Sequence, residues 1–144
     1  WSRNLTPEAA LAAGATAVTK EELFATADVI TLHLVLSDRS RGIVGAAELE
    51  RMKPTAFIVN TSRGPLIEQG ALVAALDERR IAGAGLDVFD EEPLPPDHPL
   101  LSCPNTVLTP HLGYVSVQNY RAYFAGAVEA IEGFLAGKPV RELA

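Results

Sequence analysis

Two short runs of apolar, largely β-branched residues constrain the fold of this chain most. Residues 29–35 and 56–61 contain no charged side chain and are almost continuously apolar. This pattern is typical of strands that are buried on both faces of a parallel sheet. Segments with helical spacing of apolar residues precede both runs. Alternation of helices and strands predicts an α/β domain with a parallel sheet flanked by helices.

Capping residues and apolar periodicity place the other elements. Thr6 followed by Pro7 begins a first helix that stops at Gly14, and residues 19–22 open a second short helix. Pro54 ends a helix over residues 46–52. We also expect helices over residues 68–79 and 118–135, and strands over residues 84–88 and 106–109.

Polar residues follow all four expected strands. They are His33 and Ser37 after the first strand, Asn60, Thr61, Ser62, Arg63 and Gly64 after the second, Asp87 and the acidic residues 90–92 after the third, and Pro110 and His111 after the fourth. Ligands of parallel sheets bind outside the carboxyl ends of the strands. The sequence therefore predicts a site at this edge of the sheet.

Arg63, a carboxylate of residues 90–92 and His111 are suited to a small anionic substrate. The planar guanidinium of Arg63 matches a carboxylate with two parallel hydrogen bonds, and Gly64 would let the chain turn sharply beside it. His111 can exchange a proton near neutral pH. A carboxylate such as Glu92 would orient its ring and favour the imidazolium. Each residue also has a structural alternative, since a lone Arg or a Glu-Glu-Pro segment is usually solvated surface.

Composition excludes several functions. The chain has 12 basic and 18 acidic residues, a formal charge of −6, and no basic stripe for nucleic acid or an anionic membrane. Its apolar stretches are shorter than the roughly 20 residues that span a bilayer. Its one cysteine, Cys103, fits a reducing compartment, so we expect a cytoplasmic protein. Three scattered histidines and this cysteine have no metal-ligand spacing, so no metal is expected.

Three long segments carry a resemblance to a known family. Residues 60–67 (NTSRGPLI), 83–94 (GAGLDVFDEEPL) and 109–113 (TPHLG) resemble the nucleotide-binding domain of the D-isomer-specific 2-hydroxyacid dehydrogenases. The resemblance implies a Rossmann-type sheet. It also implies hydride transfer between NAD or NADP and a small 2-keto or 2-hydroxy acid.

The resemblance assigns roles to individual residues. It implies that Arg63 clamps the substrate carboxylate, that His111 donates or accepts the hydroxyl proton, and that Glu92, which directly precedes Pro93, holds His111. Glu91 does not directly precede Pro93, so the resemblance favours Glu92 for this role. The cofactor contacts that it implies are Ser2, Arg3, Asn4, Leu34, Val35, Thr61, Ser62, Asp87, His111 and Gly113.

Two features leave the cofactor and substrate open. Ser2 stands where an Asp would bind the ribose hydroxyls of NAD, and Arg3 beside it could bind the 2′-phosphate of NADP. Val35 and Tyr114 replace a Pro and a Gly that many members of the family carry. Both departures concern the substrate more than the chemistry.

The resemblance also implies an organisation. Residues 1–113 would be the C-terminal portion of the dinucleotide-binding domain, and residues 114–144 a long crossover helix and tail returning toward a substrate domain. We expect the first strand with its glycine fingerprint, and a substrate domain, to precede Trp1 in a dehydrogenase more than twice as long, and the isolated chain to be inactive. A homodimer is implied by analogy. The alternative is a non-catalytic, corepressor-like binding protein of the same fold.

Overall fold

The computed structural model describes residues 1–142 of the 144-residue chain. It divides the chain into two compact units, Trp1–His111 and Leu112–Ala144. Each unit is described by itself below.

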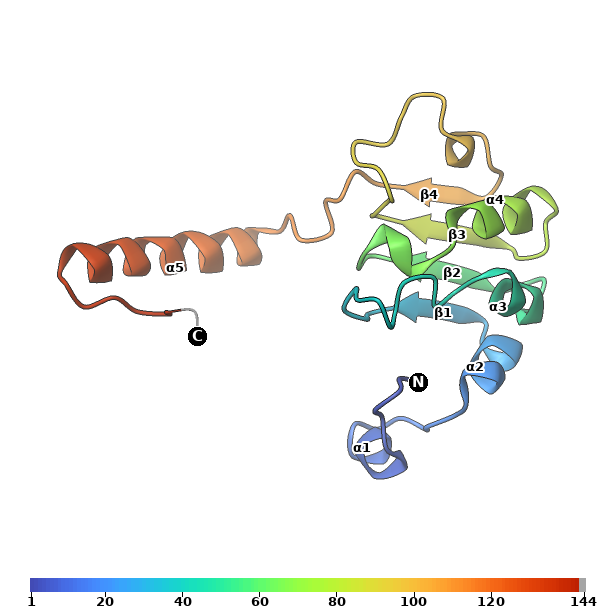
Figure 1. Ribbon diagram of the computed structural model, residues 1–144, viewed down its shortest axis with the longest axis horizontal. Helices are drawn as coiled ribbons and strands as arrows, with labels where there is room; N and C mark the ends of the chain where they lie inside the picture. Colours follow the sequence, from blue (N-terminus) through green and yellow to red (C-terminus); the bar gives the residue numbers. More distant parts are fainter. Residues whose placement is uncertain (143–144) are drawn as a thin grey trace. The chain divides into compact units, whose positions relative to one another are not determined.

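A four-stranded parallel sheet forms the centre of the first unit (Figure 1). Its strands are β1 (Val29–Leu32), β2 (Phe57–Asn60), β3 (Gly83–Leu86) and β4 (Thr106–Leu108), and they lie in the order β1-β2-β3-β4. The register aligns Leu32 with Asn60 and Asn60 with Leu86. The carboxyl ends of the strands therefore meet at one edge, and the predicted α/β fold with a parallel sheet is confirmed.

Short helices precede β1 or connect the strands. They are α1 (Pro7–Ala12), α2 (Lys20–Thr26), α3 (Ala46–Arg51) and α4 (Gln69–Asp77), with single 3-10 turns η1 (Gly64–Leu66) and η2 (Pro99–Leu101). The Thr6 hydroxyl accepts a hydrogen bond from Ala9 N–H at 3.2 Å. Thr19 and Glu22 cap α2 reciprocally. The predicted starts of both helices are confirmed.

The prediction that the first two strands are buried on both faces is wrong, and in β2 Phe57 is 48% exposed. Burial alternates along β1: Ile30 and Leu32 are buried, whereas Val29 is 60% exposed. The buried face packs against Phe24 of α2 and Leu49 of α3 in the core, and Figure 1 shows the connecting helices on one face of the sheet. The opposite face has no such cover within residues 1–111, so its apolar side chains stay exposed.

Two strands also end two or three residues earlier than the sequence predicts. β1 ends at Leu32, so Leu34 and Val35 lie in the following loop, and Val35 is exposed. β3 ends at Leu86, so Asp87 begins the loop that leads to the acidic residues. In both cases the apolar sequence continues beyond the hydrogen-bonded strand. Leu34 and Val35 line a hollow after β1, and Val88 and Phe89 are buried after β3.

The second unit contains the long helix α5 (Val117–Leu135), close to the predicted 118–135. The Ser116 hydroxyl caps it by accepting a hydrogen bond from Asn119 N–H at 3.2 Å. Tyr120, Phe124 and Phe134 are exposed along α5. Within residues 1–142, no helix has the length and apolar character that crossing a membrane requires.

Candidate active site

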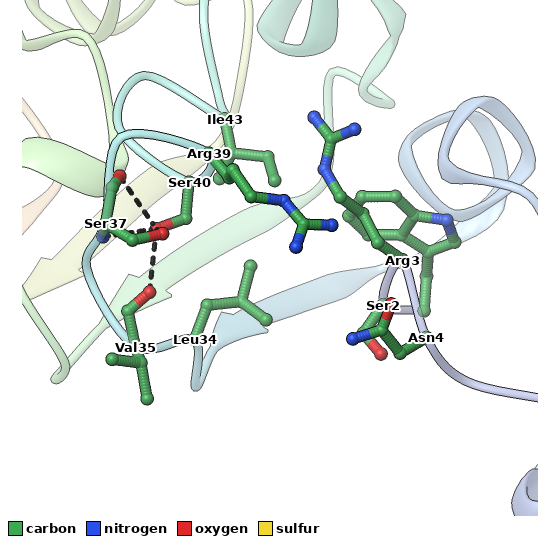
Figure 2. Close-up of a pocket in the computed structure, with 10 residues that line it drawn as sticks. Ser2, Arg3, Asn4, Leu34, Val35, Ser37, Arg39, Ser40 and Ile43 are labelled. Carbon is green, nitrogen blue, oxygen red and sulfur yellow. Dashed lines mark hydrogen bonds between the residues drawn. The ribbon is translucent and has the colours of Figure 1, made fainter.

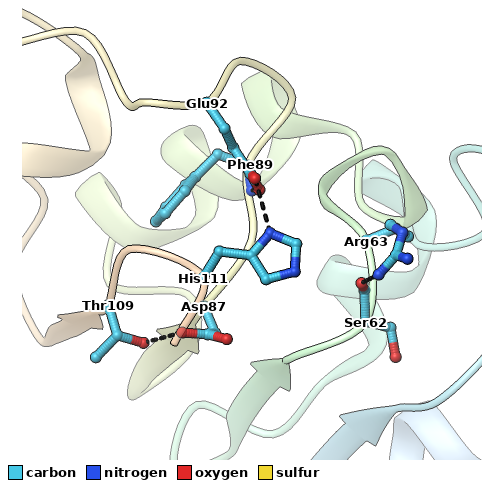
Figure 3. Close-up of polar contacts among 7 residues, drawn as sticks. All are labelled: Ser62, Arg63, Asp87, Phe89, Glu92, Thr109 and His111. Atoms are coloured by element: carbon cyan, nitrogen blue, oxygen red, sulfur yellow. Dashed lines mark hydrogen bonds and ion pairs between the residues drawn. The ribbon is translucent and has the colours of Figure 1, made fainter. Parts of the chain in front are cut away.

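His111 and Glu92 form a hydrogen-bonded pair at the carboxyl edge of the sheet. His111 Nδ1 lies 2.7 Å from Glu92 Oε2 (Figure 3). His111 follows β4, where its N–H donates to Thr109 O at 3.0 Å and its φ is +57°. Glu92 lies in the loop after β3. The side chains of His111 and Glu92 are 40% and 35% exposed, so a small molecule can approach the pair.

The second oxygen of Glu92 is held by the backbone. Glu92 Oε1 accepts a hydrogen bond from Phe89 N–H at 2.8 Å. The hydrogen bond to His111 and then that from Phe89 lower the pKa of Glu92, slight burial opposes them, and the charges of His111 and Arg63 lower it further. Glu92 is therefore ionised at neutral pH and presents a fixed carboxylate to the imidazole.

Asn60 fixes the loop that carries Arg63. This amide is almost fully buried at the end of β2. Its Nδ2 donates to Arg63 O at 2.8 Å, and its Oδ1 accepts from Ser62 N–H at 3.1 Å. Ser62 Oγ donates to Leu32 O at 2.8 Å, which ties the loop to β1. Arg63 itself is exposed, and its Nη1 donates to Ser62 O at 2.6 Å.

The positioning role of Asn60 is missing from the sequence-based prediction, which listed this residue only among the polar residues after the second strand and within a family motif. The signal was available, because strand pleating puts Asn60 on the same face as buried Ile58. A polar residue at a core position must find hydrogen-bond partners. Here these partners are the N–H of Ser62 and the carbonyl oxygen of Arg63, just before Gly64.

Gly64 has a different role from the predicted sharp turn. Its φ is not in the left-handed region. A Cβ at Gly64 would instead lie 2.1 Å from Phe89 C and 2.6 Å from Asp90 N. Gly64 therefore lets the backbone after Arg63 contact the backbone that leads to Glu92.

Asp87 links the ends of β3 and β4. It is buried, its Oδ1 accepts a hydrogen bond from the Thr109 hydroxyl at 2.5 Å, and its N–H donates to Asn60 O at 3.0 Å. Thr61 is exposed in the neighbouring loop. Gly113 belongs to the second unit, so its predicted cofactor contact stays a prediction.

Five of the predicted cofactor-binding residues line one hollow beside the end of β1. Its volume is about 220 Å³. It is lined by Trp1, Ser2, Arg3, Asn4, Leu34, Val35, Ser37, Arg39, Ser40 and Ile43 (Figure 2). The hollow combines apolar walls, which suit an aromatic base, with hydroxyl groups and two guanidinium groups, which suit a ribose and its phosphates. The residues present therefore fit the adenosine end of a dinucleotide.

The catalytic candidates lie apart from that hollow. Figure 3 shows Arg63 and Ser62 on one side of the His111 ring and Glu92 and Phe89 on the other. Residues 1–142 hold no group of three or more His, Cys, Asp or Glu side chains placed to bind a metal ion. The site therefore combines one cation, one carboxylate and one imidazole on loops that follow three parallel strands.

A comparison with protein families matches residues 1–113 to the D-isomer specific 2-hydroxyacid dehydrogenase, NAD binding domain. The chain belongs to this family. The predicted family and Rossmann-type fold are thereby confirmed, as is the prediction of a domain that binds a nicotinamide dinucleotide.

Relatives within the family cover most of this chain. It is 44% identical over 118 residues to a glyoxylate reductase of Aeropyrum pernix, which covers 82% of this chain and 35% of that protein. A crystal structure of a putative D-3-phosphoglycerate dehydrogenase from Ralstonia solanacearum is 44% identical with a TM-score of 0.87, covering 96% of this chain and 41% of that one. An acyclic imino acid reductase in complex with NADPH and D-Arg is 35% identical with a TM-score of 0.78, covering 91% and 42%. The chain thus spans about a third of the length of the curated relative and two-fifths of the solved ones.

Proposed function

We propose that the whole protein carrying this chain is an NAD(P)-dependent D-2-hydroxyacid dehydrogenase that reduces small 2-keto acids. The observation that carries the proposal is the His111–Glu92 pair at 2.7 Å, on the same sheet edge as Arg63. Relatives named for glyoxylate and for hydroxypyruvate reduction support the substrate class. The apolar walls, hydroxyl groups and two guanidinium groups of the hollow beside β1 support the dinucleotide.

The chain's own residues supply binding and proton transfer. Arg63 holds the substrate carboxylate with two parallel hydrogen bonds. His111 gives its proton to the keto oxygen in reduction and takes it back in oxidation, while Glu92 fixes the ring through Nδ1. Nε2 is then the proton-exchanging atom. When bound, the nicotinamide ring delivers or accepts the hydride at C2 of the substrate.

The other cofactor contacts belong to the same proposal. Thr61, Ser62 and Asp87 follow β2 and β3 at the edge between the adenosine hollow and the His111–Glu92 pair, which supports their contact with the nicotinamide half. Apolar residues exposed on α5 support packing against a substrate domain. A homodimer and a cytoplasmic location are also proposed; a nucleic acid or membrane partner is not.

Keto-acid-dependent oxidation of NAD(P)H tests the proposed function. We expect the whole protein to oxidise reduced dinucleotide when glyoxylate or hydroxypyruvate is added, with a loss of the absorbance of the reduced nicotinamide that is proportional to the amount of enzyme. Dinucleotide binding without oxidation by any 2-keto acid tested would contradict this proposal. That outcome would favour the corepressor-like alternative.

Replacing Glu92 tests its role beside His111. Glu92→Gln removes the negative charge that holds the imidazole, so we expect kcat to fall by about 10²-fold with little change in KM for the keto acid. Glu91→Gln is the matched control, because Glu91 is the adjacent exposed acid. Equal effects of the two substitutions would assign the loss to the loop's charge instead of to the His111 contact.

Protonation of Glu92 should not limit the reaction at neutral or mildly acidic pH. Because the folded pKa of Glu92 is lowered, its carboxylate stays ionised above the ordinary value of about 4.3, and the pair weakens only as pH falls through the lower folded value. In a pH profile of kcat/KM for the wild type, protonation of Glu92 should therefore cause no loss of activity at any pH above the ordinary carboxyl pKa of about 4.3.

A further inference from the structure

Arg3 and Arg39 enter the adenosine hollow from two separate segments. Arg3 lies in the N-terminal segment and Arg39 in the loop after β1, and Figure 2 shows their side chains extending into the same space. Neither guanidinium has an ion-pair partner within the described residues. Two like charges that face one space without a carboxylate favour an anion between them.

The hollow itself contains no acid. None of its ten lining residues is Asp or Glu, and Ser2 stands beside Arg3. A site that selects NAD uses a carboxylate to accept hydrogen bonds from the ribose hydroxyls. Without such a carboxylate, NAD loses those bonds, and a 2′-phosphate meets no repulsion. A phosphate with nearly two negative charges matches two guanidinium groups better than one.

The loop that carries Arg39 is held by hydrogen bonds. Ser40 is buried, its Oγ donates to Val35 O at 2.7 Å, and it accepts from Ser37 N–H at 2.8 Å. Gly42 N–H donates to Pro65 O at 2.8 Å, which anchors the end of the loop to η1. The backbone of Arg39 therefore has a fixed position at the rim of the hollow, so less entropy is lost when its side chain binds an anion.

We infer that Arg39 acts with Arg3 as a two-arginine clamp for the 2′-phosphate of a dinucleotide, so that the protein selects NADP(H) over NAD(H). The inference rests on the proposed function, because it requires a dinucleotide in this hollow. Arg39 is the specificity-determining residue that it adds, since sequence reasoning proposed a phosphate contact only for Arg3.

Calorimetric titration of the whole protein with two adenosine fragments tests the clamp. The probes are adenosine 2′,5′-bisphosphate, which carries the 2′-phosphate, and adenosine 5′-monophosphate, which lacks it. We expect Arg39→Gln to weaken the bisphosphate about tenfold or more and the monophosphate less than twofold. Arg3→Gln should behave in the same way.

Arg41→Gln is the matched control. Arg41 is two residues along the same loop and exposed, but it does not line the hollow. The substitution Arg41→Gln removes the same charge as Arg39→Gln. If both substitutions weakened binding of the bisphosphate equally, the effect would be general electrostatics and the clamp would be overturned. Unchanged bisphosphate affinity in Arg39→Gln would also overturn it.

Two further outcomes separate this inference from the proposed function. If wild type bound neither adenosine fragment nor any dinucleotide, the proposed function would fail and the clamp with it. If wild type oxidised NADH and NADPH with equal kcat/KM, the dehydrogenase would stand and the clamp would be overturned.

Discussion

Replacing His111 with asparagine is expected to abolish turnover of 2-keto acids, with kcat falling by about 10²–10⁴-fold or more. Asparagine can still hydrogen-bond to Glu92, whose Oε2 lies 2.7 Å from His111 Nδ1 in the wild type, but it cannot exchange a proton near neutral pH. Calorimetry should show that the dinucleotide still binds, because the adenosine hollow lies at the other end of the sheet edge and does not include residue 111.

His98→Asn provides the matched control for this substitution. His98 caps η2 by accepting a hydrogen bond from Leu100 N–H, and its other ring nitrogen contacts Gln69. Asparagine is itself a good N-cap, so the fold should tolerate the change. We expect near wild-type kcat for His98→Asn. Wild-type rates in His111→Asn would contradict the acid/base assignment.

Much of the site could be predicted because a parallel sheet collects the ends of its strands. The chain order of strand, polar residue and helix was enough to bring Arg63, Glu92 and His111 toward one edge, without any knowledge of side-chain positions. The family resemblance then added the distinction between Glu91 and Glu92. The structure agrees with that preference, since it pairs Glu92 with His111.

What the sequence did not predict depends on contacts between distant segments. Arg39 is 36 positions from Arg3 along the chain, and only the folded loop after β1 brings both to one hollow. The exposure of Val29 has the same origin, because an apolar strand residue is buried only where another element covers its face. The spacing of apolar residues indicates which side chains share one face of a strand, but not whether another element covers that face.

Gly64 shows the same limit most strongly, and its replacement is the second large effect that we expect. In Gly64→Ala, the new Cβ would lie 2.1 Å from Phe89 C and 2.3 Å from Phe89 O, and both atoms are backbone. No rotamer change relieves such a contact, so the loops that carry Arg63 and Glu92 must move apart. We expect a loss of about 1–3 kcal/mol in the free energy of unfolding.

The effect on catalysis should exceed the effect on stability. A displacement of about 1 Å in a positioned group can reduce the rate 10²-fold, so kcat/KM should fall by about that factor at temperatures where the variant is fully folded. Gly70→Ala is the matched control, since a Cβ there meets no atom within 4 Å in the first turn of α4 and alanine favours the helix. Thermal unfolding and steady-state kinetics of both variants test this prediction. If Gly64→Ala were as stable and as active as Gly70→Ala, close backbone contact at Gly64 would not be what positions the loops that carry Arg63 and Glu92.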